Sequence, residues 1–282
     1  MGTKASDKNK LIHVVPSLDY EKRLSDYLVG VFPDLATRNS AKKAIKRGMV
    51  KVNGKDAQTG IWVREGMQIE YQPVVHHGAR IYKRKIEIAY QDENLAIFWK
   101  PSGLLTSGNA HQTLHNLLLY NLDTTGLYPP RPVHRLDRAT SGLVIVSRTA
   151  QTTVSLTNLL QNREITKTYH AVVTGDVPEK DLINDVIENR QAETEVKLIE
   201  TSTSGYFSML QLRPKTGRTH QLRIHCANHG YPIVGDQLYG THDQRKGLYL
   251  SATGLAFIHP VSGEKLVIEK EIPRKLLKMM QK

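Results

Sequence analysis

An aspartate flanked by two arginines is the clearest chemical signal in the sequence. Arg135, Asp137 and Arg138 precede the apolar run at residues 143–146, which predicts a buried strand. Cationic neighbours keep a carboxylate ionised, so Asp137 could act as a nucleophile or a base beside that strand. The arginines could equally hold phosphates. A structural Arg–Asp ion pair without a catalytic role is the alternative interpretation.

The composition favours a globular chain with a polyanionic partner. The chain has 282 residues, 39% of them hydrophobic, which is enough for one large and one small domain. Lys and Arg outnumber Asp and Glu by 39 to 27, and the resulting charge of +12 favours nucleic acid as the partner. No stretch approaches the roughly 18 apolar residues of a membrane span, so we expect no membrane partner. The single cysteine, Cys226, fits a reducing compartment, and we expect a cytoplasmic monomer.

Residues 20–72 predict a small basic domain behind a solvated leader at residues 1–19. Apolar spacing predicts a helix over residues 23–28, and Asn39 and Ser40 predict the cap of a second helix. Residues 49–52 and 66–71 predict strands, the first entering a hairpin turn at Asn53 and Gly54. Like charges at i,i+4 spacing on the second helix would be relieved by phosphates, although a solvated basic face is the alternative. The like-charged pairs are Lys42 with Lys46 and Lys43 with Arg47.

Residues 86–282 predict a larger domain, which follows a linker at residues 73–85 that would let the small domain swing. A hairpin is expected over residues 86–99, and helices are expected over residues 114–122, from Thr149 to about residue 162, and over residues 216–229. Further strands are expected at residues 167–173, 194–201 and 206–213.

The histidines raise the question of a metal site. His111 and His115, and likewise His225 and His229, have i,i+4 spacing, which places both imidazoles of a pair on one helical face. Neither pair has the glutamate of a metalloprotease motif, and the sequence has no phosphate loop or dinucleotide fingerprint. We therefore expect a reaction without a metal or a cofactor.

Residues 134–142, His-Arg-Leu-Asp-Arg-Ala-Thr-Ser-Gly, resemble the active-site signature of the RluA-type pseudouridine synthases, which isomerise uridine in RNA. Further stretches resemble the family's other motifs in the family's order, at residues 92–104, 167–173, 216–225 and 234–240. Residues 20–71 resemble the RNA-binding domain named after ribosomal protein S-four. Residues 248–260 also fit the family's closing strands, so the resemblance covers nearly all of residues 20–273. The resemblance implies an α+β fold: a large mixed, mostly antiparallel sheet behind a small N-terminal α/β domain.

The resemblance also implies roles for individual residues. Asp137 would be the catalytic carboxylate, Tyr169 would lie over the target base, and Arg223 would pair with Asp137. Asp137 could attack the sugar, attack the base, or take a ribose proton, and the sequence leaves these routes open. The expected substrate-binding residues are Arg135, which would fill the gap left by a flipped base, together with Arg138, Thr140, Leu222 and Ile224. In the N-terminal domain the resemblance assigns RNA binding to Arg38, Lys42, Lys43, Lys46 and Arg47.

The resemblance favours large-subunit ribosomal RNA as the substrate, because family members with this N-terminal domain mostly modify that RNA. Transfer RNA is the alternative substrate. An inactive RNA-binding or ribosome-assembly protein is the alternative from another functional class, since the basic charge would serve it equally well. A hydrolase that cuts the glycosidic bond is a third interpretation, which free uracil among the products would reveal.

Overall fold

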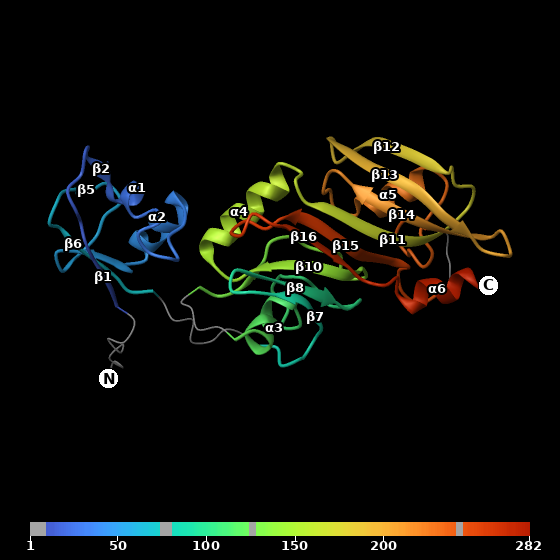
Figure 1. The fold of residues 1–282 in the computed structure, drawn as a ribbon, viewed down its shortest axis with the longest axis horizontal. Coiled ribbons are helices and arrows are strands. Elements are labelled where there is room, and N and C mark those ends of the chain that lie inside the picture. Colours follow the sequence, from blue (N-terminus) through green and yellow to red (C-terminus); the bar gives the residue numbers. More distant parts are fainter. Residues whose placement is uncertain (1–9, 74–80, 124–127, 241–244) are drawn as a thin grey trace.

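The computed structural model describes residues 10–73, 81–123, 128–240 and 245–282. Most of the expected linker, residues 74–80, lies outside this range, and residues 81–85 contain no helix or strand. Figure 1 shows the N-terminal elements grouped apart from a much larger sheet. Over the described residues, no helix is long and apolar enough to cross a membrane.

A four-stranded sheet in the order β1-β6-β3-β4 forms the N-terminal part. Its strands are β1 (Leu11–Val14), β3 (Val50–Val52), β4 (Lys55–Asp56) and β6 (Gln68–Tyr71), accompanied by β2 (Lys22–Arg23), β5 (Trp62–Val63), α1 (Leu24–Tyr27) and α2 (Arg38–Lys46). Leu24, Ile45 and Ile69 share one buried cluster, which this part of the chain builds by itself. Asn53 and Gly54 have φ angles of 49° and 78°, so the turn expected from their sequence is confirmed.

Two local features differ from the sequence-based expectation. The expected solvated leader contains β1, which pairs with β6 because Leu11 packs against the small core and His13 hydrogen-bonds the Tyr27 hydroxyl at 2.7 Å. The cap of α2 is Thr37, and neither Asn39 nor Ser40 caps it. The Thr37 side chain accepts the Ser40 backbone N–H at 3.1 Å, in a reciprocal capping box.

The strands described after residue 80 form a ten-stranded sheet. In its main path the order is β12-β13-β14-β11-β15-β10-β8-β7, with β16 pairing β15 and β9 pairing β10. The strands are β7 (Ile88–Gln91), β8 (Leu95–Lys100), β9 (Arg131–Pro132), β10 (Ser141–Ser147), β11 (Thr166–Thr174), β12 (Lys180–Ile187), β13 (Arg190–Thr201), β14 (Phe207–Pro214), β15 (Leu250–Ile258) and β16 (Lys265–Glu269). Within the described residues β10 and β15 pair in parallel and the other pairs are antiparallel, so the expected α+β fold is confirmed.

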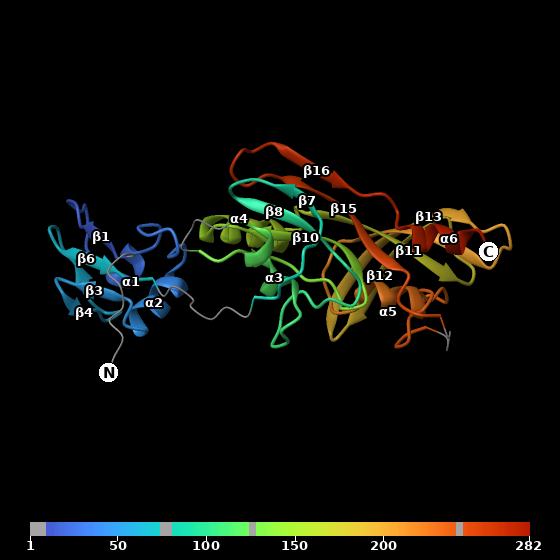
Figure 2. The ribbon, with the colours of Figure 1, turned by 90° about the horizontal axis from the view of Figure 1, so that it is seen from below.

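Helices pack on both faces of the large sheet, and Figure 2 shows α3 and α5 together below its strands. Leu117 of α3 (Leu114–Asn121) and Leu222 of α5 (Gln221–Asn228) share a buried cluster with Phe98. Leu156 of α4 (Ala150–Gln161) and Met279 of α6 (Arg274–Met280) belong to clusters built from strand residues of the opposite face. Thr149 caps α4 as its sequence predicts, because its side chain accepts the backbone N–H of Thr152 at 3.1 Å.

The start of β10 brings three segments of the chain together. Gly142 has a φ of 133°, and a Cβ atom there would lie 2.2 Å from the carbonyl oxygen of Ala252. A glycine therefore permits the close approach of β10 to β15. Since Ala252 also pairs with Tyr169 of β11, the loop that ends at Gly142 lies one strand away from Tyr169.

Candidate active site

A cleft of about 590 Å³ opens beside this junction. Asp137 and Thr140 line it from the loop before β10, Tyr169 lines it from β11, and Leu222 and Arg223 line it from α5. Segments far apart in the sequence thus contribute to one cavity of the size that proteins use for ligands.

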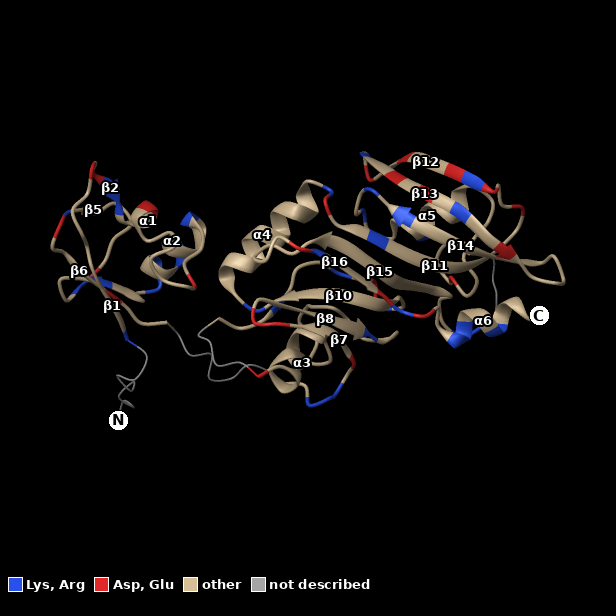
Figure 3. Ribbon diagram, viewed as in Figure 1, with Lys and Arg blue, Asp and Glu red and all other residues tan. Residues whose placement is uncertain are grey.

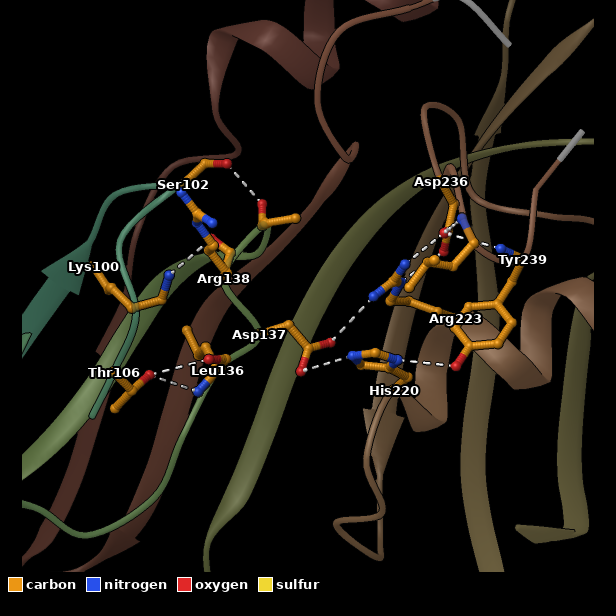
Figure 4. Close-up of polar contacts among 12 residues, drawn as sticks. Lys100, Ser102, Thr106, Leu136, Asp137, Arg138, His220, Arg223, Asp236 and Tyr239 are labelled. Carbon is orange, nitrogen blue, oxygen red and sulfur yellow. Dashed lines mark hydrogen bonds and ion pairs between the residues drawn. The ribbon is translucent and has the colours of Figure 1, made fainter. Parts of the chain in front are cut away.

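The loop that carries Asp137 is held by backbone hydrogen bonds on either side of it (Figure 4). The Thr106 hydroxyl donates to the Leu136 carbonyl at 3.0 Å and accepts the Leu136 N–H at 3.1 Å. The Thr140 N–H donates to the Asp137 carbonyl at 3.1 Å, and the Gly103 N–H donates to the Arg138 carbonyl at 2.7 Å. The Asp137 side chain therefore projects from a backbone that the neighbouring loop fixes.

Lys100 is a buried cation behind this loop. Its amine donates to the carbonyls of Leu104 at 2.8 Å and Pro101 at 3.2 Å, and it lies 3.5 Å from the Arg138 carbonyl. Burial lowers the pKa of Lys100 to about 8, although the charge of Asp137 acts in the opposite direction. Lys100 thus ties the turn before α3 to the loop of Asp137.

The carboxylate of Asp137 faces two basic side chains from the region of α5. Its Oδ1 lies 3.8 Å from His220 Nε2, and its Oδ2 lies 3.8 Å from Arg223 Nη1 (Figure 4). The Asp137 side chain is 20% exposed, so it remains accessible from the cleft. Arg223 is thus near Asp137, as the resemblance implies, but at a distance longer than a direct hydrogen bond.

The closer partner of Arg223 is Asp236. Arg223 Nε donates to Asp236 Oδ2 at 2.7 Å and Nη2 donates to Oδ1 at 2.6 Å, while the side chains are only 7% and 1% exposed. Burial by itself would raise the pKa of Asp236, but the bonds from Arg223 and from the Leu238 and Tyr239 backbone amides lower it. This bidentate pair fixes the guanidinium, whose third nitrogen faces Asp137.

His220 is held in a similar way by Tyr239. The Nδ1 atom of His220 lies 2.9 Å from the Tyr239 hydroxyl, and the backbone of His220 is left-handed, with a φ of 55°. The expected helix over residues 216–229 begins only at Gln221, because the Gln221 side chain accepts the Thr216 hydroxyl at 2.7 Å and the Arg218 N–H at 3.0 Å. The resulting turn directs the His220 ring toward Asp137.

The sequence patterns assign no role to His220, Asp236 and Tyr239. All three lie within stretches that resemble family motifs, and this was the available signal. Spacing along the chain says nothing about contact across the sheet, so their convergence on Arg223 and Asp137 became evident only in three dimensions.

Tyr169 lies on the wall of the cleft, with 9% of its surface exposed. Burial, reinforced by the negative charge of Asp137, raises the pKa of the Tyr169 hydroxyl. The phenol therefore stays protonated near neutral pH, and its ring offers an apolar surface beside the carboxylate.

The other expected substrate-binding residues divide into two groups. Arg135, Thr140 and Leu222 line the cleft, whereas Arg138 and Ile224 are not among its lining residues. Arg138 turns back on the loop, where its Nε donates to the Gly103 carbonyl at 3.1 Å.

The basic side chains expected to bind RNA lie along α2 and at its end. Lys43, Lys46 and Arg47 are exposed, Lys42 is half-buried, and Arg38 forms a 2.6 Å ion pair with Asp26. Figure 3 shows lysine and arginine on α2, while β12 at the far edge of the large sheet carries both acidic and basic residues. The exposed cations of α2 are thus available to a polyanion.

Of the histidine pair at α5, only His229 contacts carboxylates of β12 among the described residues. His229 Nδ1 lies 3.7 Å from Asp181 and Nε2 lies 3.4 Å from Asp185, and His225 is fully buried. In the part of the chain that the structure describes, no three His, Cys, Asp or Glu side chains are arranged to hold a metal ion.

The cleft brings an accessible carboxylate, Asp137, together with several lysine and arginine side chains. Residues 94–228 match the family model for RNA pseudouridylate synthase. An RNA pseudouridine synthase of Chloroflexus aurantiacus, described as uncharacterized, is 33% identical over 275 residues, covering 89% of this chain and 86% of the relative. The ribosomal large subunit pseudouridine synthase D of Escherichia coli K12 is 30% identical over 302 residues, covering 92% and 90%.

Among solved structures, the human RNA pseudouridylate synthase domain containing 1 has a TM-score of 0.57 and 25% identity, covering 69% of this chain and 87% of that one. The chain therefore belongs to the RluA-type RNA pseudouridine synthase family, and its reaction is the isomerisation of uridine in RNA.

Proposed function

We propose that this enzyme forms pseudouridine in large-subunit ribosomal RNA with Asp137 as its catalytic residue. The observation that carries the assignment is the position of the Asp137 carboxylate, which is 20% exposed in the cleft and faces both Arg223 and His220 at 3.8 Å. The isomerisation breaks the C–N glycosidic bond and joins the same sugar carbon to C5 of the base. The proton on C5 leaves and N1 gains one, so no oxidant or donor group is consumed.

In this proposal the neighbours of Asp137 prepare it for its role. Arg223, held by Asp236, and His220, held by Tyr239, lie on one side of the carboxylate and fix the direction from which it meets the substrate. The target base is flipped out of its helix at a cost of a few kcal/mol. Tyr169 then packs on the uracil, and Arg135, which is exposed at the cleft, fills the gap left in the RNA.

The choice of ribosomal RNA rests on the relatives. Several are described as ribosomal large subunit pseudouridine synthase D, and they align with 92–95% of this chain at about 30% identity. The full length of the alignment includes the N-terminal part, so the resemblance is not confined to the catalytic cleft.

Deleting the gene in its host should remove pseudouridine from large-subunit ribosomal RNA and from no other RNA. Pseudouridines across total RNA are mapped by their reactivity with carbodiimide, and complementation with the intact gene serves as the control. Loss confined to transfer RNA would overturn the ribosomal target but leave the chemistry standing. Free uracil released in vitro would instead indicate a hydrolase.

Residues 20–72 act in this proposal as an RNA-binding domain of the S-four type, joined by a linker to the catalytic domain at residues 86–282. Support comes from the separate apolar core of this part of the chain and from the exposed cations on α2. A second binding unit on the same chain raises the effective concentration of the catalytic cleft on a large folded RNA.

Replacing Lys43, Lys46 and Arg47 by glutamine should make RNA binding less sensitive to salt. Each lost phosphate contact lowers the slope of log affinity against log salt concentration by about 0.7 to 0.9, so the triple variant should lose up to about 2–3 from its slope. The measurement is a titration of RNA binding by fluorescence anisotropy at several salt concentrations. The matched control replaces the exposed Lys180, Lys197 and Lys265, which removes the same charge elsewhere. Equal slopes for the parent and the α2 variant would show that α2 faces solvent in the complex.

A further inference from the structure

The cleft continues beyond Tyr169 toward the C-terminal end of α4. Lys167 precedes Tyr169 by two residues on β11, and both side chains line the cleft, although the register of β11 against β15 shifts between Thr168 and Tyr169. Lys167 carries no assigned role, although it lines the same cleft. A uracil packed on Tyr169 therefore leaves this end of the cleft, here called the α4 subsite, unfilled.

One wall of the α4 subsite is apolar. Val133, Leu160 and Ile165 line it. Ile165 is buried, with 4% of its surface exposed, and Val133 and Leu160 are half-buried side chains packed against the same core cluster. In an RNA substrate, the bases supply the broad apolar faces that such a wall accepts.

The cationic side chains of the cleft differ in whether a protein group already pairs with them. Six lysine and arginine side chains line it: Arg135, Arg163, Lys167, Lys215, Arg218 and Arg223. Lys215 pairs with Glu195 at 2.6 Å, Arg218 donates to the Gln191 carbonyl at 3.0 Å, and Arg223 pairs with Asp236. Over the residues that the structure describes, the ammonium of Lys167 has no such partner.

The surroundings of Lys167 make an unpaired ammonium unfavourable. Burial lowers the pKa of Lys167, which reports the cost of holding an ammonium away from water without a counterion. The Nζ atom lies 4.0 Å from the position that a Cβ atom on Gly217 would take, so it sits against the loop that leads to His220. A phosphate oxygen entering the cleft would satisfy this group by a charge-assisted hydrogen bond.

We propose that the α4 subsite binds a nucleotide adjoining the target uridine, with the neighbouring base against Val133, Leu160 and Ile165 and its phosphate on Lys167. The inference rests on the proposed function, which places the target uridine beside Asp137. It assigns to the cleft a second nucleotide, so that the sequence beside the target is read as well as the target itself.

The test uses a short RNA that the parent enzyme modifies, whichever RNA that proves to be. Synthetic versions carry either a neutral methylphosphonate linkage or an abasic residue, placed on one side of the target or on the other. They are combined with Lys167→Met, which removes the charge at similar size, and with Leu160→Ala. Lys197→Met removes an exposed charge outside the cleft and is the matched control. Thermal unfolding verifies that each variant is folded.

With natural RNA, Lys167→Met should lower kcat/KM about tenfold, the effect expected for one lost charge-assisted hydrogen bond. On one side of the target, the methylphosphonate should lower kcat/KM of the parent by a similar factor and should have little further effect on Lys167→Met. In the same way, an abasic residue on that side should lower kcat/KM of the parent and should have little further effect on Leu160→Ala.

The loss in kcat/KM from Lys167→Met could instead multiply in full with the loss from the methylphosphonate, on whichever side of the target the linkage is placed. That result would overturn the subsite. An equal loss in Lys197→Met would do the same, because it would reduce the effect to bulk charge. Lys167→Met could also lower kcat alone and show no coupling to the methylphosphonate on either side. That result would place the amine on the uracil and would also contradict the subsite. Failure of the proposed function would be recognised by different results, namely turnover by Asp137→Asn or a target outside ribosomal RNA.

Discussion

Replacing Asp137 by asparagine should abolish pseudouridine formation while RNA affinity stays within a few-fold of the parent. The amide keeps the size of the side chain but loses its charge and its nucleophilicity. We expect turnover to fall by at least about 10⁴-fold, the upper end of what a single proton-transferring group contributes. The measurement is the release of tritium from C5 of uridine-labelled RNA, alongside a binding titration.

Binding should be retained because Asp137 contributes negative charge to a basic cleft. Removing that charge leaves Arg223 and His220 without their shared carboxylate, which favours the approach of a polyanion. Asp176→Asn is the control, since Asp176 is an exposed aspartate that does not line the cleft. Full turnover by Asp137→Asn would remove Asp137 from the reaction, and joint loss of binding and turnover would point to a structural role.

The second large effect concerns the buried pair of Arg223 and Asp236. Replacing Arg223 by methionine leaves Asp236, whose side chain is 1% exposed, without its partner, and we expect a loss of about 3–5 kcal/mol in the free energy of unfolding. Turnover should also fall steeply, because the positive charge nearest to Asp137 Oδ2 is gone. Denaturant unfolding and tritium release measure the two effects.

A double variant separates these two effects. Asp236→Asn on the Arg223→Met background removes the unpaired charge and keeps an oxygen to accept the Leu238 and Tyr239 amides. Most of the lost stability should return, whereas turnover should not. If turnover returned with stability, Arg223 would act on the reaction only by keeping the protein folded.

The same pair predicts how stability depends on pH. Although burial acts to raise it, the pKa of Asp236 is lowered in the folded protein from the ordinary value of 3.8 by Arg223 and by backbone amides. A depressed carboxyl pKa stabilises the fold above the unfolded value, and the contribution is lost as the pH falls through the folded value. The difference in stability between parent and Arg223→Met should therefore narrow below about pH 4.

Local sequence patterns correctly predicted the elements whose causes are local. Thr149 caps α4, and Asn53 and Gly54 turn the first hairpin, because a cap or a turn depends on a few consecutive residues. The run that became β10 is buried on both faces of the sheet, so its residues are apolar without interruption. The stretch around Asp137 identified the candidate carboxylate for the same reason, since its chemistry is written in consecutive residues.

Elements whose stability depends on distant partners were missed. In β12, Leu182 and Val186 are exposed while Asp181 and Asp185 face His229 of α5, so the usual relation between polarity and exposure is inverted. The strand β1 was assigned to the leader because its pairing with β6 involves residues far along the chain. Neither strand has a local sequence pattern that would predict it.

The sequence by itself determined the candidate carboxylate, the basic character of the chain and the segments that carry the family's motifs. Only the tertiary structure decided how the side chains meet. It placed Arg223 between Asp137 and Asp236, with the shorter bonds to Asp236, and it brought His220 to Asp137 through a left-handed turn. These contacts join side chains on separate strands, loops and helices, and their distances depend on how the sheet and α5 pack, which no run of consecutive residues specifies.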